Sequence, residues 1–289
     1  MTKASNQKPF QIERLTGTIG AVVSGIDLAI AQPDAVMRAI EDALHEHSVL
    51  FFVGQNLDDT SHRRFGSWFG ELDVHHSRRN LDGYPEIYVL EGYGNEIQWH
   101  ADITFQERPA RASVLRPVTL PSVGGDTIWT STCVAYDALS SSMQRFVDGL
   151  HAYHDSSSLN GRDPDLEILG ATHPVVIDHP WSGRRSIFVN PMFTKRIVEL
   201  SESESAAVLS VLYQYIQSPS HQIRWKWRPD AVAMWDNFAT QHFVVYDYSE
   251  PRSMRRVTIK GKRPISSRIA KGGTVDAERP EVPEKAFAE

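Results

Sequence analysis

The sequence predicts a mainly β protein with flanking helices, folded as a sandwich or barrel. Short runs of β-type residues, broken by turn residues, recur through the C-terminal two thirds of the 289-residue chain, and this pattern is typical of such folds. A jelly roll accommodates it with two packed sheets. The chain is 41% hydrophobic and 23% charged, an ordinary globular composition. We therefore expect a single domain over residues 1–289, with its core at about 10–264.

Two helices and one buried strand are expected before the β-rich part. Residues 34–46 carry apolar side chains at helical spacing, and the apolar run 49–53 suits a buried strand. Residues 58–69 form a second candidate helix, which ends at Gly70.

Further strands and helices follow in the β-rich part. We expect one helix over Tyr136–Leu150 and another that opens at Ser201, where Glu204 completes a capping-box pattern. Residues 265–289 are expected to form a loosely ordered tail. The expected strands are 86–90, 127–130, 173–177, 187–190, 231–235 and 256–260.

Composition and charge exclude several classes of protein. The net charge of −6 and pI near 6.1 argue against nucleic-acid binding, which needs a basic face. No run approaches the roughly 18 apolar residues of a membrane span, and residues 1–10 do not resemble a signal peptide. Because Cys133 is the only cysteine, there is no internal disulfide and no thiolate metal cluster. We expect a cytoplasmic protein with a small-molecule substrate, assembled as a homo-oligomer (dimer or tetramer).

A candidate metal site comes from two separate segments. His100 and Asp102 point to the same side of an extended segment, because their spacing is two residues. His242 ends a second segment, Trp235–His242, in which a turn-forming Asp-Asn pair follows a β-type run. Two histidines and one carboxylate form the facial triad of Fe(II) oxygenases. For the motif alone, a surface or core histidine remains the alternative, since the chain has 12 histidines.

A pair of arginines strengthens the metal interpretation. Arg252 and Arg256 follow His242 at a short distance and would share one face of a strand. A buried arginine needs an anion, and a dicarboxylate co-substrate would supply one. The alternative is that both arginines pair with surface acids.

Taken together, the ordered motifs resemble the family of taurine dioxygenase, 2,4-dichlorophenoxyacetate dioxygenase and alkylsulfatase. The resemblance runs from about Leu15 to Pro264. The motifs that carry it are Thr16–Asp27, Phe51–Gln55, Trp99–Phe105, Gly124–Trp129, Trp235–His242 and Met254–Thr258.

The resemblance implies a double-stranded β-helix, which is a jelly roll, and a dioxygenase that uses Fe(II), 2-oxoglutarate and O2. Substrate hydroxylation would be coupled to decarboxylation of 2-oxoglutarate to succinate and CO2. Thr127 would donate to the distal carboxylate of 2-oxoglutarate, Arg252 would pair with it, and Arg256 would lie between co-substrate and substrate. The implied iron ligands are His100, Asp102 and His242.

The substrate is predicted to be anionic with an apolar body. His75 matches the position that contacts the sulfonate in taurine dioxygenase; the alternative is an exposed loop histidine. Arg78 and Glu96 stand where taurine dioxygenase has a tyrosine and an asparagine, and Phe238 replaces the arginine that is usual in the family. Phe193, Phe238 and Phe243 could each be an ordinary core residue, but together they favour a larger, more apolar substrate than taurine. Residues 155–172 are too polar for the core and are a candidate active-site lid. The predicted substrate-contacting residues are His75, Arg78, Glu96, Phe193, Phe238, Phe243 and Arg256.

Three alternatives stay open. A sulfonate, sulfate ester or carboxylate would suit the cationic residues, whereas a natural-product hydroxylase would act on a larger neutral substrate. A metal-free jelly-roll binding protein would not use the triad. A cupin-type dioxygenase without 2-oxoglutarate would leave Thr127 and Arg252 unexplained.

Overall fold

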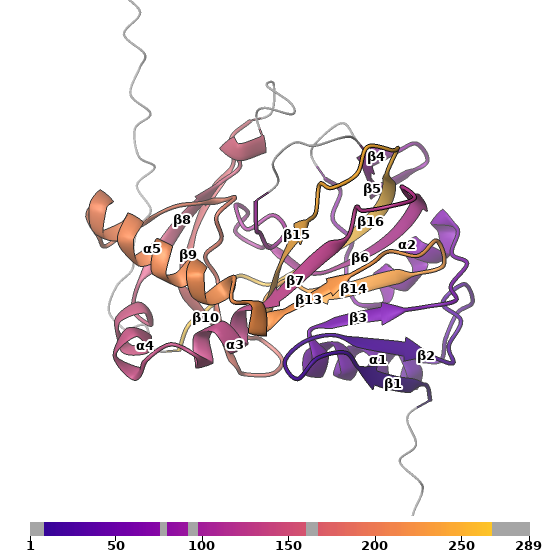
Figure 1. Cartoon of the computed structure of the whole chain (residues 1–289), viewed down its shortest axis with the longest axis horizontal. Helices are drawn as coiled ribbons and strands as arrows, with labels where there is room; N and C mark the ends of the chain where they lie inside the picture. Colours follow the sequence, from indigo (N-terminus) through magenta and orange to yellow (C-terminus); the bar gives the residue numbers. More distant parts are fainter. Residues whose placement is uncertain (1–8, 76–79, 92–97, 160–166, 268–289) are drawn as a thin grey trace, which may run out of the picture.

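The computed structural model describes residues 9–75, 80–91, 98–159 and 167–267. Its largest element is an eight-stranded sheet that crosses the molecule (Figure 1). All neighbouring strands in it run antiparallel except β2 and β3, which are parallel. In spatial order the strands are β1 (Gln11–Arg14), β2 (Ala21–Ser24), β3 (Val49–Phe52), β14 (Val232–Asp236), β6 (Ala110–Thr119), β16 (Ser253–Lys260), β5 (Tyr84–Glu91) and β4 (Asn80–Leu81).

A second sheet faces the first and completes the jelly roll. It holds β13 (Gln222–Trp225), β7 (Thr127–Ser131) and β15 (Thr240–Val244), with β7 in the centre. Phe51 of β3, Trp235 of β14 and Trp129 of β7 belong to the apolar cluster between the sheets. Because side chains alternate along a strand, Leu50 and Phe52 face the opposite side of the large sheet, where they join another apolar cluster.

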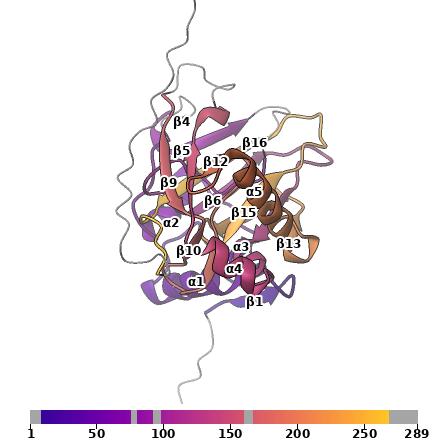
Figure 2. The same ribbon diagram turned by 90° about the vertical axis from the view of Figure 1, so that its left-hand side faces the viewer.

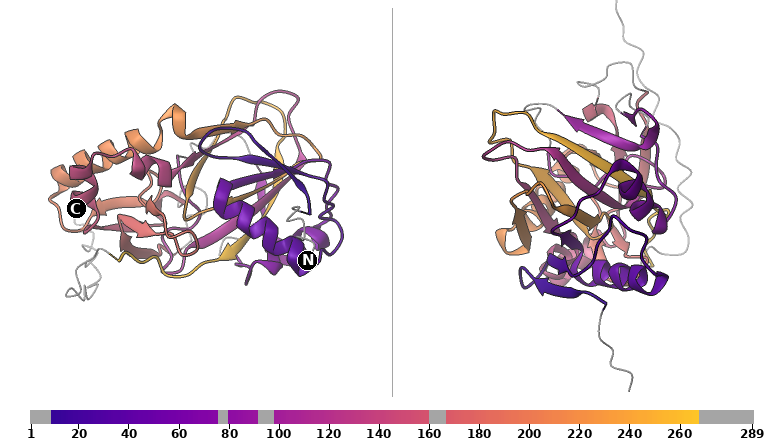
Figure 3. Two further views of the ribbon diagram at one scale, coloured as in Figure 1. Left: turned by 90° about the horizontal axis from the view of Figure 1, so that it is seen from below. Right: turned by 90° about the vertical axis from the view of Figure 1, so that its right-hand side faces the viewer.

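Helices α1 (Asp34–His47) and α2 (Asp59–Trp68) cover that opposite side. Ile40 and Leu44 of α1 and Phe65 of α2 pack in the same cluster as Leu50 and Phe52 of β3. Figure 3 shows α1 in purple, running beneath the strands. The large sheet is therefore buried on both faces, which explains why β3 is apolar throughout.

A third part of the molecule, here called the helical lobe (the described residues of 132–221), continues from one end of the two sheets (Figure 1), and Figure 2 shows it facing the viewer. Its apolar cluster includes side chains of the three helices, among them Tyr136, Val147 and Leu212. The lobe contains α3 (Thr132–Asp137), α4 (Ser141–Val147), β8 (His151–Asp155), the 3-10 helix η1 (Ser157–Leu159), β9 (Gly170–Pro174), β10 (Val176–Asp178), β11 (Arg185–Ile187), β12 (Thr194–Ile197), α5 (Glu202–Ile216) and the 3-10 helix η2 (Pro219–His221).

The jelly roll and most elements of the predicted pattern are confirmed, but three predictions in the helical lobe are wrong. The helix over 136–150 is two helices, because Ser140 accepts a hydrogen bond from Met143 N–H and starts α4. The strand over 173–177 is divided, because the N–H of Val175 bonds to Leu150 O. The strand over 187–190 ends at Ile187, because the Asn190 side chain closes a turn by accepting from Phe193 N–H.

The predicted tail and lid fall partly outside the described residues. Residues 265–267 are not loose, since Ile265 O accepts from Asp178 N–H and Ser267 N–H donates to the Asp178 carboxylate; residues 268–289 lie outside. In the predicted lid, residues 170–172 belong to β9, whereas residues 160–166 lie outside. Among the helices that the structure describes, none is both long and apolar enough to cross a membrane.

Candidate metal centre

The two predicted histidine ligands are held together by the backbone. His100 and His242 form an isolated antiparallel bridge, in which each N–H donates to the other's carbonyl at 3.1 and 2.8 Å. His242 lies in β15 and pairs with Trp129 in β7, so its side chain faces the large sheet. The bridge therefore fixes segments that are more than 140 residues apart in the sequence and brings both imidazoles to one point.

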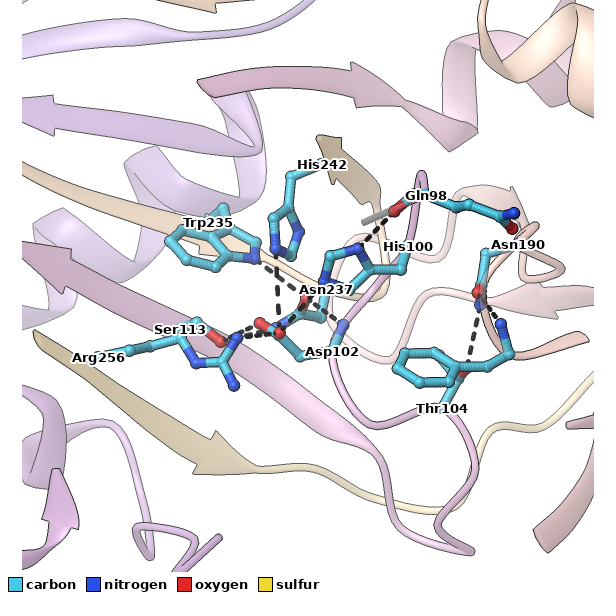
Figure 4. A network of polar contacts seen from close by, with 11 residues as sticks. Gln98, His100, Asp102, Thr104, Ser113, Asn190, Trp235, Asn237, His242 and Arg256 are labelled. Atoms are coloured by element: carbon cyan, nitrogen blue, oxygen red, sulfur yellow. Dashed lines mark hydrogen bonds and ion pairs between the residues drawn. The ribbon is translucent and has the colours of Figure 1, made fainter. Parts of the chain in front are cut away.

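Asp102 completes a convergent group of three ligand atoms (Figure 4). Its Oδ1 lies 4.0 Å from Nε2 of His100 and 3.9 Å from Nε2 of His242. All three side chains are buried, and their ligand atoms lie within 4.8 Å of one another. One metal ion at ~2 Å from each atom can bridge these separations.

The charge states of these groups suit a metal. Burial by itself would raise the pKa of Asp102, but the positive charge of Arg256 opposes it, with the hydrogen bond from Ser113 acting in the same sense, and the pKa lies well below its ordinary value. Burial lowers the pKa of His242 well below its ordinary value, so the imidazole is neutral. Nδ1 of His100 lies 2.8 Å from Gln98 O; assigning the proton to Nδ1 leaves a lone pair on Nε2. Two neutral imidazoles and a carboxylate therefore fit a divalent iron ion.

Two of the predicted co-substrate residues lie at strand ends: Thr127 is the first residue of β7, and Arg252 directly precedes β16. Arg252 is 9% exposed, its Nε donates to Gly125 O at 3.1 Å, and its Nη2 has no hydrogen-bond partner among the described residues. A Cβ at Gly125 would lie 3.1 Å from the Arg252 side chain, so the glycine allows this close approach. Thr127 Oγ1 accepts from Trp227 Nε1 at 2.9 Å, which leaves the hydroxyl proton of Thr127 for another acceptor. These groups offer an anion one buried guanidinium and one hydroxyl.

Arg256 lies against the triad rather than in open space. Its Nη1 donates to Asp102 Oδ1, its guanidinium lies 5.3 Å from the centre of the Tyr88 ring, and its Nε has no hydrogen-bond partner among the described residues. His75 stacks on the same tyrosine, with the two ring centroids 4.4 Å apart. Tyr88, which the sequence did not single out, thus connects His75 to Arg256.

The structure brings only some of the predicted substrate residues to the metal site. Phe193 packs edge-on against His100, with ring centroids 5.9 Å apart. Phe243 points to the other face of β15, because it alternates with His242, and it stacks on Trp99 at 5.6 Å. Phe238 is fully buried and stacks on Phe188 at 5.9 Å in a separate core cluster. Arg78 and Glu96 lie outside the described residues.

Several residues of the site have no signal of their own in the sequence. Ser113 donates to Asp102 Oδ2 at 2.7 Å, and Asn237 accepts from Asp102 N–H at 3.0 Å. Asn237 stands inside the motif Trp235–His242, but its spacing from Asp102 is not informative. Ser113 lies in β6, a strand that the sequence analysis did not predict. The pairing of β6 with β14 places Ser113 next to Asn237, which directly follows β14, and only the three-dimensional structure reveals this pairing.

Comparison with known proteins places this geometry among characterised relatives. The sequence model described as "Taurine catabolism dioxygenase TauD, TfdA family" matches residues 11–258. The chain is 35% identical over 284 residues to an alkylsulfatase from Acinetobacter baylyi, which covers 92% of this chain and 89% of the relative. It is also 35% identical over 287 residues to an alpha-ketoglutarate-dependent sulfate ester dioxygenase from Pseudomonas putida, covering 92% and 94%. A crystal structure of a taurine dioxygenase from Burkholderia xenovorans matches with a TM-score of 0.81 and 35% identity, covering 89% of this chain and 93% of that one.

Proposed function

The chain belongs to the taurine catabolism dioxygenase TauD, TfdA family, and from this premise we propose that it hydroxylates a sulfate ester of an apolar alcohol. It is a 2-oxoglutarate-dependent dioxygenase that uses Fe(II) and O2. The names of two relatives, an alkylsulfatase and a sulfate ester dioxygenase, each 35% identical to the chain, support this choice of substrate.

In this proposal His100, Asp102 and His242 hold the iron, since they form the one convergent group of ligand atoms found among the described residues. Iron with 2-oxoglutarate and O2 supplies the oxidising power for C–H hydroxylation. The protein's residues bind and orient: Arg252 pairs with the distal carboxylate of 2-oxoglutarate, and the free hydroxyl proton of Thr127 donates to the same group. The unpartnered Nη2 of Arg252 is the observation that supports this placement, because a buried donor without an acceptor is costly.

The charge balance of the site favours a substrate with one negative charge. Arg252, Arg256, Asp102 and a metal dication together carry three positive charges, and 2-oxoglutarate removes two of them. One positive charge remains in a buried site, where an unbalanced charge is unfavourable. The observation that carries the proposal is the pair of buried arginines, each with a nitrogen that has no partner among the described residues, because a monoanionic sulfate ester would neutralise the remaining charge and a neutral substrate would not. Arg256 donates to Asp102 through Nη1, and its Nε, which has no partner among the described residues, is the donor proposed for the sulfate group.

The apolar part of the substrate would lie against Phe193. This ring touches His100, and it belongs to an apolar cluster with Ile103 and Phe105, against which Leu159 and Leu169 pack. Leu159 and Leu169 come from the two ends of the predicted lid. Hydroxylation of the carbon that bears the sulfate oxygen gives an unstable adduct, whose C–O bond breaks to leave an aldehyde and release sulfate.

A matched substrate series tests the proposal. Hexyl sulfate, hexanesulfonate, hexanoate and hexanol share the apolar body and differ in the head group. Incubated with Fe(II), 2-oxoglutarate and O2, the enzyme should form succinate fastest with hexyl sulfate, together with equimolar hexanal and sulfate. Faster succinate formation with hexanesulfonate or hexanoate would contradict the sulfate-ester assignment. Turnover of hexanol as fast as hexyl sulfate would contradict the charge argument and support the natural-product hydroxylase with a neutral substrate.

A further inference from the structure

We propose that Ser113 and Asn237 are positioning residues that restrict Asp102 to a single metal-binding oxygen. The restriction keeps enough coordination positions open for a keto acid and O2 together. The inference rests on the proposed iron site but concerns two residues that never touch the metal. Their hydrogen bonds form a closed ring around the Asp102 carboxylate (Figure 4).

The direction of each hydrogen bond in this ring is fixed by its chemistry. Asn237 Oδ1 accepts from Trp235 Nε1 at 3.0 Å and from the backbone N–H of Asp102 at 3.0 Å. Both of these groups can only donate, so the amide oxygen of Asn237 must face them. Nδ2 of Asn237 therefore points at Ser113 Oγ, 3.1 Å away, and donates to it. The hydroxyl proton of Ser113 must then be directed elsewhere.

That proton is directed at one oxygen of Asp102. Ser113 Oγ donates to Oδ2 of the carboxylate at 2.7 Å, whereas Oδ1, which also accepts from Arg256 Nη1, is the oxygen that faces both imidazoles. Ser113 is fully buried, and Asn237 and Asp102 are each 2% exposed. A buried network in which every member is hydrogen-bonded is rigid. Oδ2 is therefore held away from the metal position and Oδ1 is presented to it.

The number of Asp102 oxygens bound to the metal decides how many further ligands the metal can take. Two imidazoles and one carboxylate oxygen leave three positions of an octahedral metal open. A 2-oxo acid that chelates through two oxygens fills two of them and leaves one for O2. If both oxygens of Asp102 bound the metal, only two positions would remain, and the co-substrate and O2 would compete. The Ser113 hydroxyl thus protects a vacant position at a distance.

Ser113→Ala tests the inference by removing the donor to Oδ2, and with it the acceptor of Asn237 Nδ2. Anaerobic Fe(II) enzyme is titrated with 2-oxoglutarate through the visible charge-transfer band, and nitric oxide then serves as a probe of the remaining position, read by electron paramagnetic resonance. We expect Fe(II) affinity to be kept or increased, the dissociation constant of 2-oxoglutarate to rise by about 10–100-fold, and the nitrosyl signal to fall even at saturating 2-oxoglutarate. Ser113→Thr, which keeps the hydroxyl, should restore both.

Two further variants make the outcome decisive. Ser186→Ala is the matched control, because Ser186 is also fully buried and its hydroxyl lies 2.7 Å from another hydroxyl, that of Thr132 in the helical lobe; it should behave as wild type. Asn237→Asp replaces the donor to Ser113 with an acceptor, draws the hydroxyl proton away from Asp102, and should reproduce Ser113→Ala if that variant does not fold. Wild-type 2-oxoglutarate and nitric oxide binding in a folded variant of either kind would overturn the inference. Absence of the charge-transfer band in the wild-type protein would instead overturn the proposed function.

Discussion

Two buried groups of histidines flank the segment that follows Gln98, and they differ in what surrounds them. On one side, His100 and His242 converge with the carboxylate of Asp102. On the other side lies a group here called the hairpin cluster: Thr104, His154, His173, Asn190 and Thr194. Nδ1 of His154 lies 3.0 Å from Thr104 Oγ1, and Nε2 of His173 lies 3.0 Å from both Thr104 O and Gln106 O. Figure 4 shows Thr104 and Asn190 set apart from the triad.

The difference explains why the triad, and not the hairpin cluster, is the candidate metal centre. In the hairpin cluster the described partners of the imidazoles are hydroxyl and carbonyl oxygens, and Phe188 packs against both rings. Burial lowers the pKa of both histidines, so neither is charged at neutral pH. Buried neutral imidazoles are thus common to both groups. Only the triad adds a carboxylate whose charge is balanced by an arginine, and this is the ligand set that iron requires.

The largest expected effect is the loss of iron and activity on substitution of a triad histidine, which a substitution in the hairpin cluster should not cause. His242→Ala should abolish 2-oxoglutarate turnover and iron retention, because two ligands hold the ion poorly. His173→Gln should keep one iron per chain, since its amide can still donate to the two carbonyls. Metal analysis after anaerobic loading and desalting, together with succinate formation, measures both. Full activity of His242→Ala, or loss of iron from His173→Gln, would remove the distinction.

The next largest effect is expected for Arg252, whose Nη2 has no hydrogen-bond partner among the described residues. Arg252→Ala should raise the KM for 2-oxoglutarate strongly, because removing one member of a buried, hydrogen-bonded charge pair costs about 2–5 kcal/mol. Arg255→Ala is the matched control from the adjoining strand β16: Arg255 is less buried and lies 3.7 Å from Glu91 on the surface. An unchanged KM in Arg252→Ala would show that the co-substrate binds elsewhere.

The hairpin cluster should affect the pH dependence of the free energy of unfolding rather than the rate of catalysis. Burial lowers the pKa of His173 to about 4, against an ordinary value of 6.5. Between these pH values the unfolded chain binds a proton that the folded chain does not, so the free energy of unfolding falls as pH falls through this window. At about 1.4 kcal/mol per pKa unit, the loss is about 3 kcal/mol.

Urea unfolding of wild type and His173→Gln at pH 7 and pH 4.5 measures this contribution. The variant should lose less stability than wild type on acidification. His62, whose pKa burial lowers to about 3, remains in both proteins and contributes equally. Identical pH dependence in the two proteins would show that His173 is protonated in the folded state or is not responsible.

The sequence is most informative where the residues of the candidate site lie within a recognisable sequence motif. His100, Asp102 and His242 could be predicted because the family motifs supplied both segments; the expected extended geometry is wrong for Asp102, which lies in a turn after the isolated bridge of His100. The helical lobe was harder: Ser140 and Asn190 end or start elements through their side chains, and these hydrogen bonds interrupt an otherwise regular hydrophobic pattern. The prediction that Phe243 contacts the substrate is wrong: side chains alternate along β15, so Phe243 points away from the face that carries His242. Ser113 and Asn237 could not have been paired from sequence, because their contact depends on the register of β6 against β14.

The smallest expected effect is the loss of the Thr127 hydroxyl, with Thr194 of the hairpin cluster as the control. Thr127→Val removes the proposed donor to 2-oxoglutarate and leaves Trp227 Nε1 without its acceptor. A hydrogen bond to a charged group contributes about 1.5–3 kcal/mol, so the KM for 2-oxoglutarate should rise by about 10–150-fold, less than for Arg252→Ala. Thr127→Ser should restore the wild-type KM. Thr194→Val is the control from the hairpin cluster, where Thr194 Oγ1 accepts from Asn190 N–H at 2.9 Å; it should lower the thermal midpoint but leave the KM unchanged. If Thr194→Val raises the KM as much as Thr127→Val, both effects report general loosening of the fold, and Thr127 has no specific part in binding the co-substrate.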